Sequence, residues 1–423
     1  MNRVSIGRSV RTAVALTLVA GLSLVSACGG ASSNAKPSNE IRISWAGSDT
    51  VNTAVNAALD DFEKKDGIKS LREAQDWSGY WDKLATQVAA KNAPDVIYQV
   101  ASQIPNYSTK NALVDLNTMD IDLSNMDEGV KSFGEADGKL WGIVSAANAY
   151  TLIVNPAILE KAGVTIPDGD YSWNDLAQFA TQAAEGTDGG WGLNDGGGDF
   201  TLFVLWVRSR GRELYTDDGK LNATKEDVSE WFKYWDDLRK AGAVPPADVT
   251  SEGASAATSN PFVQGKSAMT FGWTQDFTNN QALMKQEIDP KLPPNDTKNP
   301  GLWMNAASMW SISSTSKNKE NAAKAIDFLI NDETAVKDQG LALGIPPTQK
   351  ARDAVKTNAS DADKKIIDYM DTVAKVSKPL NRLWPEGFPQ LRTKFSELNE
   401  AVAFGTTSIN QAAEDLFDEA ANY

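Results

Sequence analysis

The chain has 423 residues, and its 41 lysines and arginines against 56 acidic residues give a formal net charge of −15 at pH 7. A surface this acidic repels nucleic acid, which binds to basic faces, so we expect no nucleic-acid partner. The chain has no histidine and only one cysteine, which excludes Ser-His-Asp and Cys-His catalysis, histidine-ligated zinc and a disulfide within the chain.

The first 27 residues have the pattern of an export signal. Three arginines stand before an apolar run over residues 12–25, and small residues follow up to Cys28. A basic start, a short apolar middle and a small-residue end are typical of a signal peptide. The apolar run is shorter than the stretch of about 20 residues that a membrane-spanning helix needs. We therefore expect a signal peptide over 1–27, whose removal leaves 38 basic against 56 acidic residues, a net charge of −18.

The end of this signal resembles the lipobox of bacterial lipoproteins. In that motif small residues lead to a cysteine that becomes the lipidated N-terminus, and here they lead to Cys28. The resemblance implies a palmitate-type anchor at Cys28, on the outer face of the cytoplasmic membrane. An ordinary signal peptide with an incidental cysteine is the alternative. Residues 28–39 are small, polar and interrupted by proline, which is typical of a flexible tether.

The first part of the mature chain is predicted to alternate strands and helices. Apolar residues alternate over 41–45 as in a half-buried strand, and they recur at helical spacing over 51–62, with Gly67 as a stop. A second helix has its apolar face over 81–89, and a short apolar strand follows at 96–98. Strand, helix, helix and strand without a tight hairpin predict a parallel α/β sheet.

The same alternation continues to the C-terminus. The patterns predict strands over 152–154, 268–271 and 309–312, and helices over 173–184 (with Ser172 as N-cap), 228–240 and 321–330. A glycine-rich loop is expected over 188–199 and a proline-rich loop over 286–301. From residue 361 the pattern is mainly helical, with an interruption over 379–389.

Short motifs occur in one order between residues 40 and 423. They are Trp-Ser-Gly-Tyr-Trp-Asp-Lys-Leu at 77–84 with Ala-Pro-Asp-Val-Ile at 93–97, Asp-Gly-Lys-Leu-Trp-Gly-Ile at 137–143, Leu-Ile-Val-Asn at 152–155, Phe-Val-Gln-Gly-Lys-Ser-Ala-Met at 262–269, and Ser-Lys-Asn-Lys-Glu at 316–320. In this order they resemble the extracellular solute-binding proteins of ABC importers, in particular the sugar-binding family that includes maltose-binding protein. The resemblance implies a receptor that captures a carbohydrate and delivers it to the transmembrane subunits of a permease, without cofactor, metal or catalytic residue.

The fold implied by the resemblance is α/β and periplasmic-binding-protein-like, with two lobes and the ligand cleft between them. Three crossings of the chain would join the lobes, near Ser145, near 305–309 and near 376–380. Lobe 1 would then comprise 40–144 and 310–376, and lobe 2 would comprise 145–309 and 377–423. We expect this receptor to be a monomer.

The resemblance also marks loop positions at strand ends as ligand contacts. A neutral sugar offers hydroxyl groups to polar side chains and C–H faces to aromatic rings. The implied contacts are Ser48, Asp49, Glu73, Tyr80, Gln99, Ser102, Asn148, Asp199, Trp206, Trp273, Trp303, Asn305, Trp384 and Arg392. Gln99 stands where the family has an aromatic residue, which argues against a maltodextrin as the ligand.

Several of these residues have a purely structural alternative. Asp49 is placed to cap a helix, Glu73 and Arg392 are typical of solvated charges, and Trp206 lies in a run of apolar residues that predicts core packing. Trp273, between an apolar strand and a polar turn, is the strongest aromatic candidate.

Other functions remain open from the sequence. A glycan-acting enzyme with two carboxylates needs no histidine, and the same fold could bind a polyamine, a peptide or a polyol phosphate instead of a sugar. Ser-x-x-Lys occurs at 314–317 and 316–319, but the partner motifs of serine acyl-transfer enzymes are missing. A calcium site in the loop 188–199 would lack the spacing of an EF-hand, so a loop at the cleft edge is favoured.

Overall fold

The computed structural model describes residues 39–423 apart from 127, 297, 382–383 and 386. The expected signal peptide, Cys28 and nearly all of the tether lie outside the described residues. Residues from Ser38 to Tyr423 form one compact unit. Within the described part, no helix has both the length and the apolar character needed to cross a membrane.

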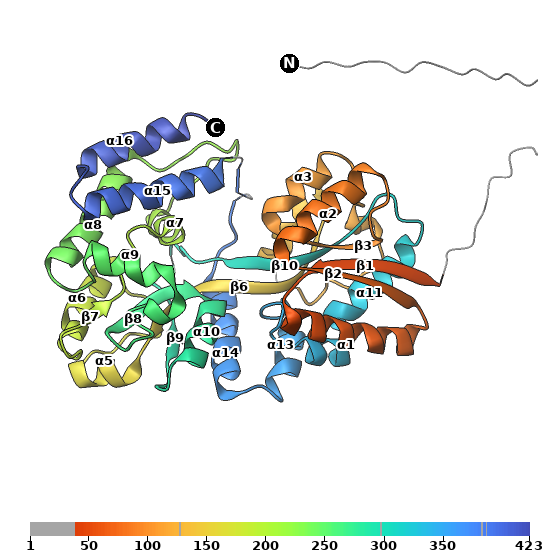
Figure 1. The fold of residues 1–423 in the computed structure, drawn as a ribbon, viewed down its shortest axis with the longest axis horizontal. Helices are drawn as coiled ribbons and strands as arrows, with labels where there is room; N and C mark the ends of the chain where they lie inside the picture. The colour runs from red at the N-terminus through yellow and green to blue at the C-terminus, as the bar shows by residue number, and fades with distance from the viewer. Residues whose placement is uncertain (1–38, 127, 297, 382–383, 386) are drawn as a thin grey trace, which may run out of the picture. The chain divides into compact units, whose positions relative to one another are not determined.

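The first lobe contains three parallel strands, β1 (Glu40–Ala46), β2 (Lys69–Gln75) and β3 (Val96–Gln99), with β1 in the middle (Figure 1). Helix α1 (Asp49–Asp66) connects β1 to β2 and ends at Gly67, whose φ of +66° is in the left-handed region that glycine adopts readily. Helix α2 (Trp77–Ala89) connects β2 to β3. The predicted parallel α/β arrangement is therefore present in this lobe.

Two long antiparallel strands continue the sheet from the first lobe into the second. β6 (Ile143–Val154) pairs through its first half with β10 (Met304–Ile312) and through its second half with β8 (Ser267–Trp273) and β9 (Asp289–Lys291). The resulting sheet has eight strands in the order β2-β1-β3-β10-β6-β8-β7, with β9 beside β6. Because β6 and β10 run against their neighbours, the whole sheet is mixed rather than parallel.

The second lobe is built around β8 and the parallel strand β7 (Trp191–Leu193). Its helices include α6 (Trp173–Ala184), α7 (Phe200–Ser209) and α8 (Lys225–Lys240). The predicted N-cap of α6 is confirmed, because Ser172 and Asp175 form a reciprocal capping box. The other helices and short segments of the described chain are η1 (Ala101–Gln103), α3 (Ile104–Ser108), η2 (Leu116–Thr118), α4 (Glu128–Lys131), η3 (Ser132–Gly134), β4 (Glu135–Ala136), β5 (Lys139–Leu140), α5 (Pro156–Ala162), α9 (Ala247–Ser255), η4 (Ala257–Ser259), α10 (Thr274–Leu283), α11 (Lys319–Asn331), α12 (Glu333–Gln339), α13 (Gln349–Lys356), α14 (Asp361–Val376), α15 (Phe388–Ala403) and α16 (Ile409–Ala420).

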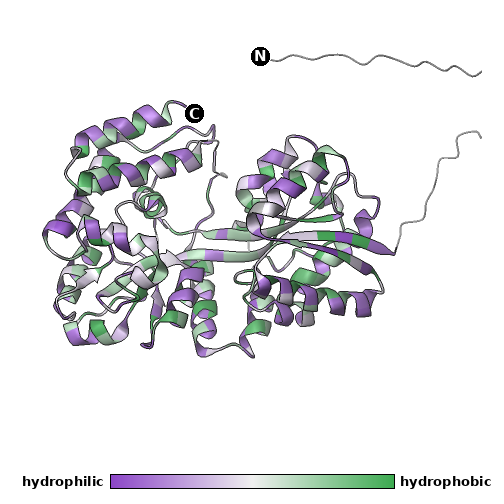
Figure 2. Cartoon of the chain, viewed as in Figure 1, coloured by the Kyte–Doolittle hydropathy of each residue, from purple (hydrophilic) through white to green (hydrophobic). Residues whose placement is uncertain are grey.

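Apolar side chains of the central strands form the core. Figure 2 shows hydrophobic residues along these strands and many hydrophilic residues on the outer helices. Trp45, Trp310 and Trp231 are fully buried. The predicted inner face of α11 is confirmed, because Ala322, Ala325, Ile326 and Leu329 are buried.

Helix α14 contacts elements of both predicted lobes. The expected boundary at 376 assigns α14 to lobe 1, but α14 packs against α10 and β9 of the second lobe. Tyr369 of α14 donates a hydrogen bond to the carbonyl of Tyr150, and Lys365 forms an ion pair with Asp289 at 2.7 Å. α14 also packs against α13, where Arg352 pairs with Asp371 at 2.6 Å, so the boundary at 376 stays a prediction.

Candidate functional site

The carboxyl ends of the first lobe's parallel strands lie beside the strands that cross between the lobes. Gln99, the last residue of β3, is opposite Met309 of β10, whereas Val96 is opposite Ile312. The carboxyl end of β3 therefore points toward the amino end of β10, the part that pairs with β6 alone. Because β1, β2 and β3 are parallel, their following loops share this edge of the sheet, where ligands bind in open α/β sheets.

The carboxyl end of β8 approaches the same crossing strands from the second lobe. Trp273, its last residue, is opposite Tyr150 of β6. Two positions earlier along β6, Asn148 is opposite Asn305 of β10, and the Asn305 amide donates to the Asn148 side-chain oxygen at 2.9 Å. Asn148 and Asn305, two of the predicted contacts, are thus brought together beside Trp273.

Aromatic side chains from four segments gather at this end of the second lobe. Trp273 contacts Tyr150 and Trp303 edge to face, with ring centroids 5.1 and 6.3 Å apart, respectively. Trp303 contacts Trp384 at 5.9 Å, and Trp384 stacks on Phe388, the first residue of α15, at 4.4 Å. We call these five residues the aromatic platform. Trp303 is buried, whereas Trp273 and Trp384 are partly exposed, so these two can offer ring surface to a ligand.

A buried carboxylate adjoins the platform. Asp199 is the N-cap of α7, and its side chain accepts hydrogen bonds from the backbone N–H groups of Thr201 and Leu202 and from the Tyr150 hydroxyl. Burial raises the pKa of Asp199 above its ordinary value, because the hydrogen bonds only partly offset the loss of water around the charge.

A second carboxylate caps the helix that follows β8. Asp276 of α10 accepts a hydrogen bond from the backbone N–H of Trp273 at 2.7 Å. Burial raises the pKa of this carboxyl group as well, with the hydrogen bond acting in the opposite direction. Asp276 therefore fixes the turn that orients Trp273.

Three of the predicted contacts lie away from the platform and have partners in the core or in ion pairs, and their role as ligand contacts stays a prediction. Tyr80 is buried in the first lobe, and its hydroxyl donates to the carbonyl of Tyr98 at 2.7 Å. Glu73 forms ion pairs with Arg42 and Lys83 at 2.7 and 2.9 Å. Trp206 is buried among the aromatic residues under α6 and α8, in accordance with its core-packing alternative.

The remaining predicted contacts have mixed surroundings. Ser48 is the N-cap residue of α1, and Asp49 is the first helical residue rather than the cap. Both are exposed, as are Ser102 in η1 and Arg392 on α15. Gln99 is fully buried, and neither polar atom of its amide has a hydrogen-bond partner among the described residues.

Trp77 was not among the predicted ligand contacts. It is the first residue of α2, directly after the β2 edge, and its side chain is 55% exposed although most tryptophans here are buried. Its ring contacts Trp81 at 5.5 Å and Tyr98 at 6.4 Å, which fixes the exposed face. The available signal was its position after a strand end and next to Asp76, whose side chain caps α2 through the Gly79 N–H at 2.9 Å.

The glycine-rich loop uses its carboxylates internally. Asp188 pairs with Lys161, Asp195 pairs with Arg239, and Asp199 accepts from Tyr150. Across the part of the chain that the structure describes, no group of three or more His, Cys, Asp or Glu residues is placed to hold a metal ion.

Comparison with known proteins identifies the family. The model of the bacterial extracellular solute-binding protein family matches residues 57–366. The chain belongs to this family. The resemblance noted from its motifs is thereby confirmed, and members of the family act outside the cytoplasm.

Solved and curated relatives agree with this assignment. An extracellular solute-binding protein of family 1 from Alicyclobacillus acidocaldarius is 30% identical, with a TM-score of 0.81 over 92% of this chain and 98% of that one. The diacetylchitobiose binding protein of Streptomyces coelicolor is 25% identical over 311 residues, 71% of each chain. A putative binding protein of Brucella abortus is 29% identical over 212 residues, and the match spans about half of each protein (48% of this chain and 49% of the relative). The expected two-lobed fold of this family is confirmed.

Proposed function

We propose that this chain is the substrate-binding component of an ABC importer, and that it captures a sugar and passes it to the transmembrane subunits of a permease. The observation that carries the proposal is the aromatic platform. It lies beside the amide pair Asn148–Asn305 and the carboxylate of Asp199, at the crossing between the lobes. Partly exposed indole rings fit the C–H faces of a sugar, and amides and carboxylates fit its hydroxyl groups.

The composition of this site favours a neutral saccharide over the alternatives. A polyamine would need several carboxylates facing the ligand, and an anion would need basic groups or free helix N-termini. Asp199 and Asp276 are instead engaged by Tyr150 and by backbone N–H groups, respectively. The Streptomyces relative is named as a diacetylchitobiose binding protein, and this name supports a carbohydrate ligand.

In the proposed mechanism the ligand bridges the lobes. One face would rest on the platform of the second lobe, and Trp77 would cover it from the strand-end edge of the first lobe. A ligand that contacts both lobes stabilises their closed arrangement, which the permease would then recognise. Lipidation at Cys28 would hold the receptor at the outer face of the membrane as a monomer, and the bound sugar would be released unchanged.

Thermal unfolding of residues 38–423 against mono-, di- and oligosaccharides, polyamines and short peptides tests the proposal. A ligand at one hundred times its Kd adds about 2.7 kcal/mol of stability, which raises the midpoint by several degrees. We expect this shift with one class of saccharide and no turnover of it. A shift only with polyamines or peptides, a shift with none of the compounds, or hydrolysis of a glycoside would contradict the proposal.

Two tryptophan substitutions localise the site. Trp273→Ala and Trp77→Ala should each weaken saccharide binding by about tenfold or more, because each removes a ring that covers the sugar. Phe404→Ala is the matched control, since Phe404 is a 51% exposed aromatic residue at the end of α15. Titration calorimetry should give the same affinity for this control as for the unaltered protein; equal affinity for the two tryptophan variants would move the site elsewhere.

A further inference from the structure

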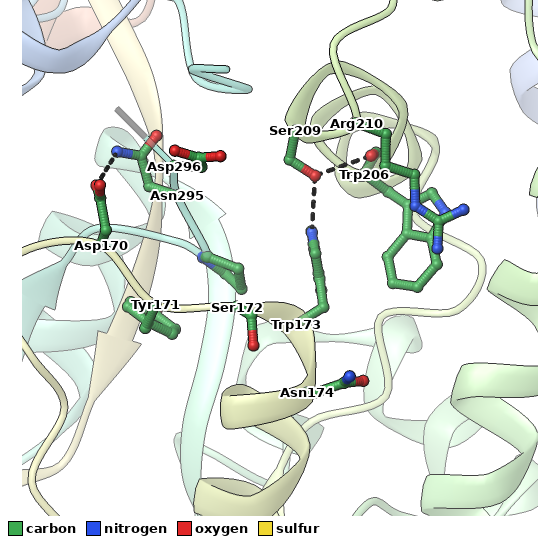
Figure 3. A pocket seen from close by; sticks show the side chains of 11 residues that line it. Asp170, Tyr171, Ser172, Trp173, Asn174, Trp206, Ser209, Arg210, Asn295 and Asp296 are labelled. Atoms are coloured by element: carbon green, nitrogen blue, oxygen red, sulfur yellow. Dashed lines mark hydrogen bonds between the residues drawn. The ribbon is translucent and has the colours of Figure 1, made fainter. Parts of the chain in front are cut away.

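A cavity in the second lobe lies apart from the aromatic platform. Its volume is about 440 Å³, within the range of small-molecule sites. It lies between the amino end of α6, the carboxyl end of α7 and the loop after β9 (Figure 3). None of its lining residues belongs to the platform. The cavity is therefore separate from the proposed sugar site.

The inner wall of this cavity is aromatic. Tyr171, Trp173 and Trp206 line it, and their side chains are buried. Trp173 meets Trp206 edge to face at 5.4 Å, and its indole N–H donates to the Ser209 hydroxyl at 3.3 Å. These contacts hold the rings in place, so the wall is preformed for an apolar body.

One side wall concentrates hydrogen-bond acceptors. The backbones of Tyr171 and Asn295 exchange two hydrogen bonds, of 3.2 and 3.0 Å, as an isolated antiparallel bridge. This pairing puts Asp170 opposite Asp296, with Asp170 exposed and Asp296 partly buried. Figure 3 shows both carboxylates on the same side of the cavity, beside Asn295.

The amide between these carboxylates is incompletely bonded. Asn295 is buried, and its amide nitrogen donates to Asp170 at 3.1 Å. Its side-chain oxygen has no hydrogen-bond partner among the described residues. Among the described residues the Asp296 side chain accepts a hydrogen bond from the backbone N–H of Lys298 at 2.9 Å, and no basic side chain of these residues forms an ion pair with it. This side wall therefore offers hydrogen-bond acceptors to the N–H groups of a ligand.

The opposite wall already holds a neutralised cation. The guanidinium of Arg210 lies over the Trp206 ring, 4.0 Å from its centroid, and forms an ion pair with Glu230 at 2.6 Å. Arg210 therefore covers one face of this indole and directs its charge away from Asp296. The covered face is not offered to a sugar ring.

From these walls we propose that the cavity binds a small organic cation, a protonated amine on a compact apolar body. The ammonium group donates to the Asp296 carboxylate, and the apolar body lies against Tyr171 and Trp173. An anion would bring acceptors against acceptors. A neutral alcohol of the same shape would supply a donor but no charge to offset the Asp296 carboxylate.

A series of three similar probes tests this site: benzylammonium, benzyl alcohol and benzoate. With residues 38–423, titration calorimetry should detect binding of benzylammonium, at least about tenfold weaker binding of benzyl alcohol, and none of benzoate. Benzylammonium binding should weaken as salt rises, because the attraction is partly between full charges. Equal affinity for benzylammonium and benzyl alcohol, or no binding of benzylammonium, would overturn the proposal.

The variants Asp296→Asn and Asp170→Asn locate the bound cation. Asparagine keeps an oxygen acceptor for Lys298 or Asn295, so both variants should fold, with a melting midpoint close to that of the unaltered protein. Each should weaken benzylammonium binding by about tenfold. The control Asp188→Asn removes a carboxylate of the same lobe outside the cavity and should leave this affinity unchanged. Unchanged affinity for benzylammonium in the Asp296 variant would place the cation elsewhere. Saccharide binding should persist in all three variants.

Discussion

At the scale of single residues, the pair Tyr150–Asp199 links the second lobe's core to the aromatic platform. The Tyr150 hydroxyl donates to Asp199, and its ring packs against Trp273. Burial raises the pKa of both groups above their ordinary values, since each loses water around its charged form. A carboxyl group with a raised pKa in the folded protein makes stability depend on pH in a direction opposite to that of most acidic residues.

The variant Asp199→Asn tests this direction. Between the ordinary pKa of 3.8 and the higher folded pKa, the unfolded chain has lost the Asp199 proton while the folded chain retains it. The stability of the unaltered protein relative to the variant should therefore fall as pH rises through this window. Urea unfolding of both proteins from about pH 3 to about pH 7 measures the difference.

Asp175→Asn is the contrasting control for this experiment. Hydrogen bonds from the backbone and side chain of Ser172 hold the pKa of Asp175 below 3.8, so its contribution is present above 3.8 and is lost as pH falls through the folded value. The relative stability should consequently rise with pH for Asp175, opposite in sign to Asp199. The same sign for both variants would contradict the role of burial at Asp199.

The sequence predicts the platform better than the rest of the site. Trp273 ends one apolar strand and Trp303 stands directly before another. Ligands in this kind of fold bind at the ends of the strands, so tryptophans at these positions are natural candidates. Trp206 and Trp77 show the limit of such reasoning. Trp206 lies in an apolar run and Trp77 between Asp76 and Ser78, and the packing of distant elements buries the first and leaves the second 55% exposed. One-dimensional spacing carries no information on those elements.

At the scale of elements, helix starts are well specified by local chemistry. The capping box of α8 joins Thr224 and Asp227, whose side chains each accept from the other's backbone N–H group. This helix buries Trp231, Phe232 and Trp235 against the core, so its first turn supports a large apolar contact.

Thr224→Ala should destabilise the protein by about 1 kcal/mol, because the Asp227 N–H loses its acceptor. Thr224→Ser keeps the hydroxyl and should restore most of the loss. Urea midpoints of the three proteins decide, provided that the slope of the transition is unchanged. Equal midpoints for the alanine and serine variants would contradict the capping role.

Three of the elements that were not predicted lack a clear alternation or helical period of apolar residues. β2 is an edge strand in which Ser70 is the only buried residue, so the alternation of apolar residues is absent. β7 has three residues and lies inside the segment expected to be a glycine-rich loop. α7 is apolar on nearly every face because it is buried all round, which removes the helical period from the sequence. These three lack the one-sided apolar face from which helices such as α11 were predicted.

At the scale of the whole molecule, Arg208 ties together segments that lie far apart in the sequence. Its side chain is 1% exposed and pairs with Glu213 at 2.9 Å. It donates to the carbonyls of Gly301 at 2.8 Å, Lys378 at 3.0 Å and Pro379 at 2.8 Å. Gly301 lies just before the predicted crossing near 305–309, and Lys378 and Pro379 lie within the predicted crossing near 376–380. The Arg208 guanidinium therefore fixes both segments to α7.

Arg208→Lys should therefore destabilise the folded protein by about 2–4 kcal/mol, since an ammonium group cannot reproduce the planar set of donors and leaves buried carbonyls without partners. Arg210→Lys, on the same helix but with a 35% exposed side chain, should change stability by less than about 1 kcal/mol. Urea unfolding compares the two. Similar effects of both substitutions would show that the buried contacts of Arg208 carry no special weight.

β10 is synthesised long after β3, although the two strands are neighbours in the sheet. β3 is complete at Gln99, but its neighbour on the far side from β1 is supplied by Met309, 210 residues later. While the chain emerges N-terminus first, the first lobe has one strand edge unpaired until most of the second lobe has followed it. An unpaired edge is a template for association with other chains. A polypeptide interrupted before β10 would therefore be a fragment prone to aggregate rather than a smaller working lobe.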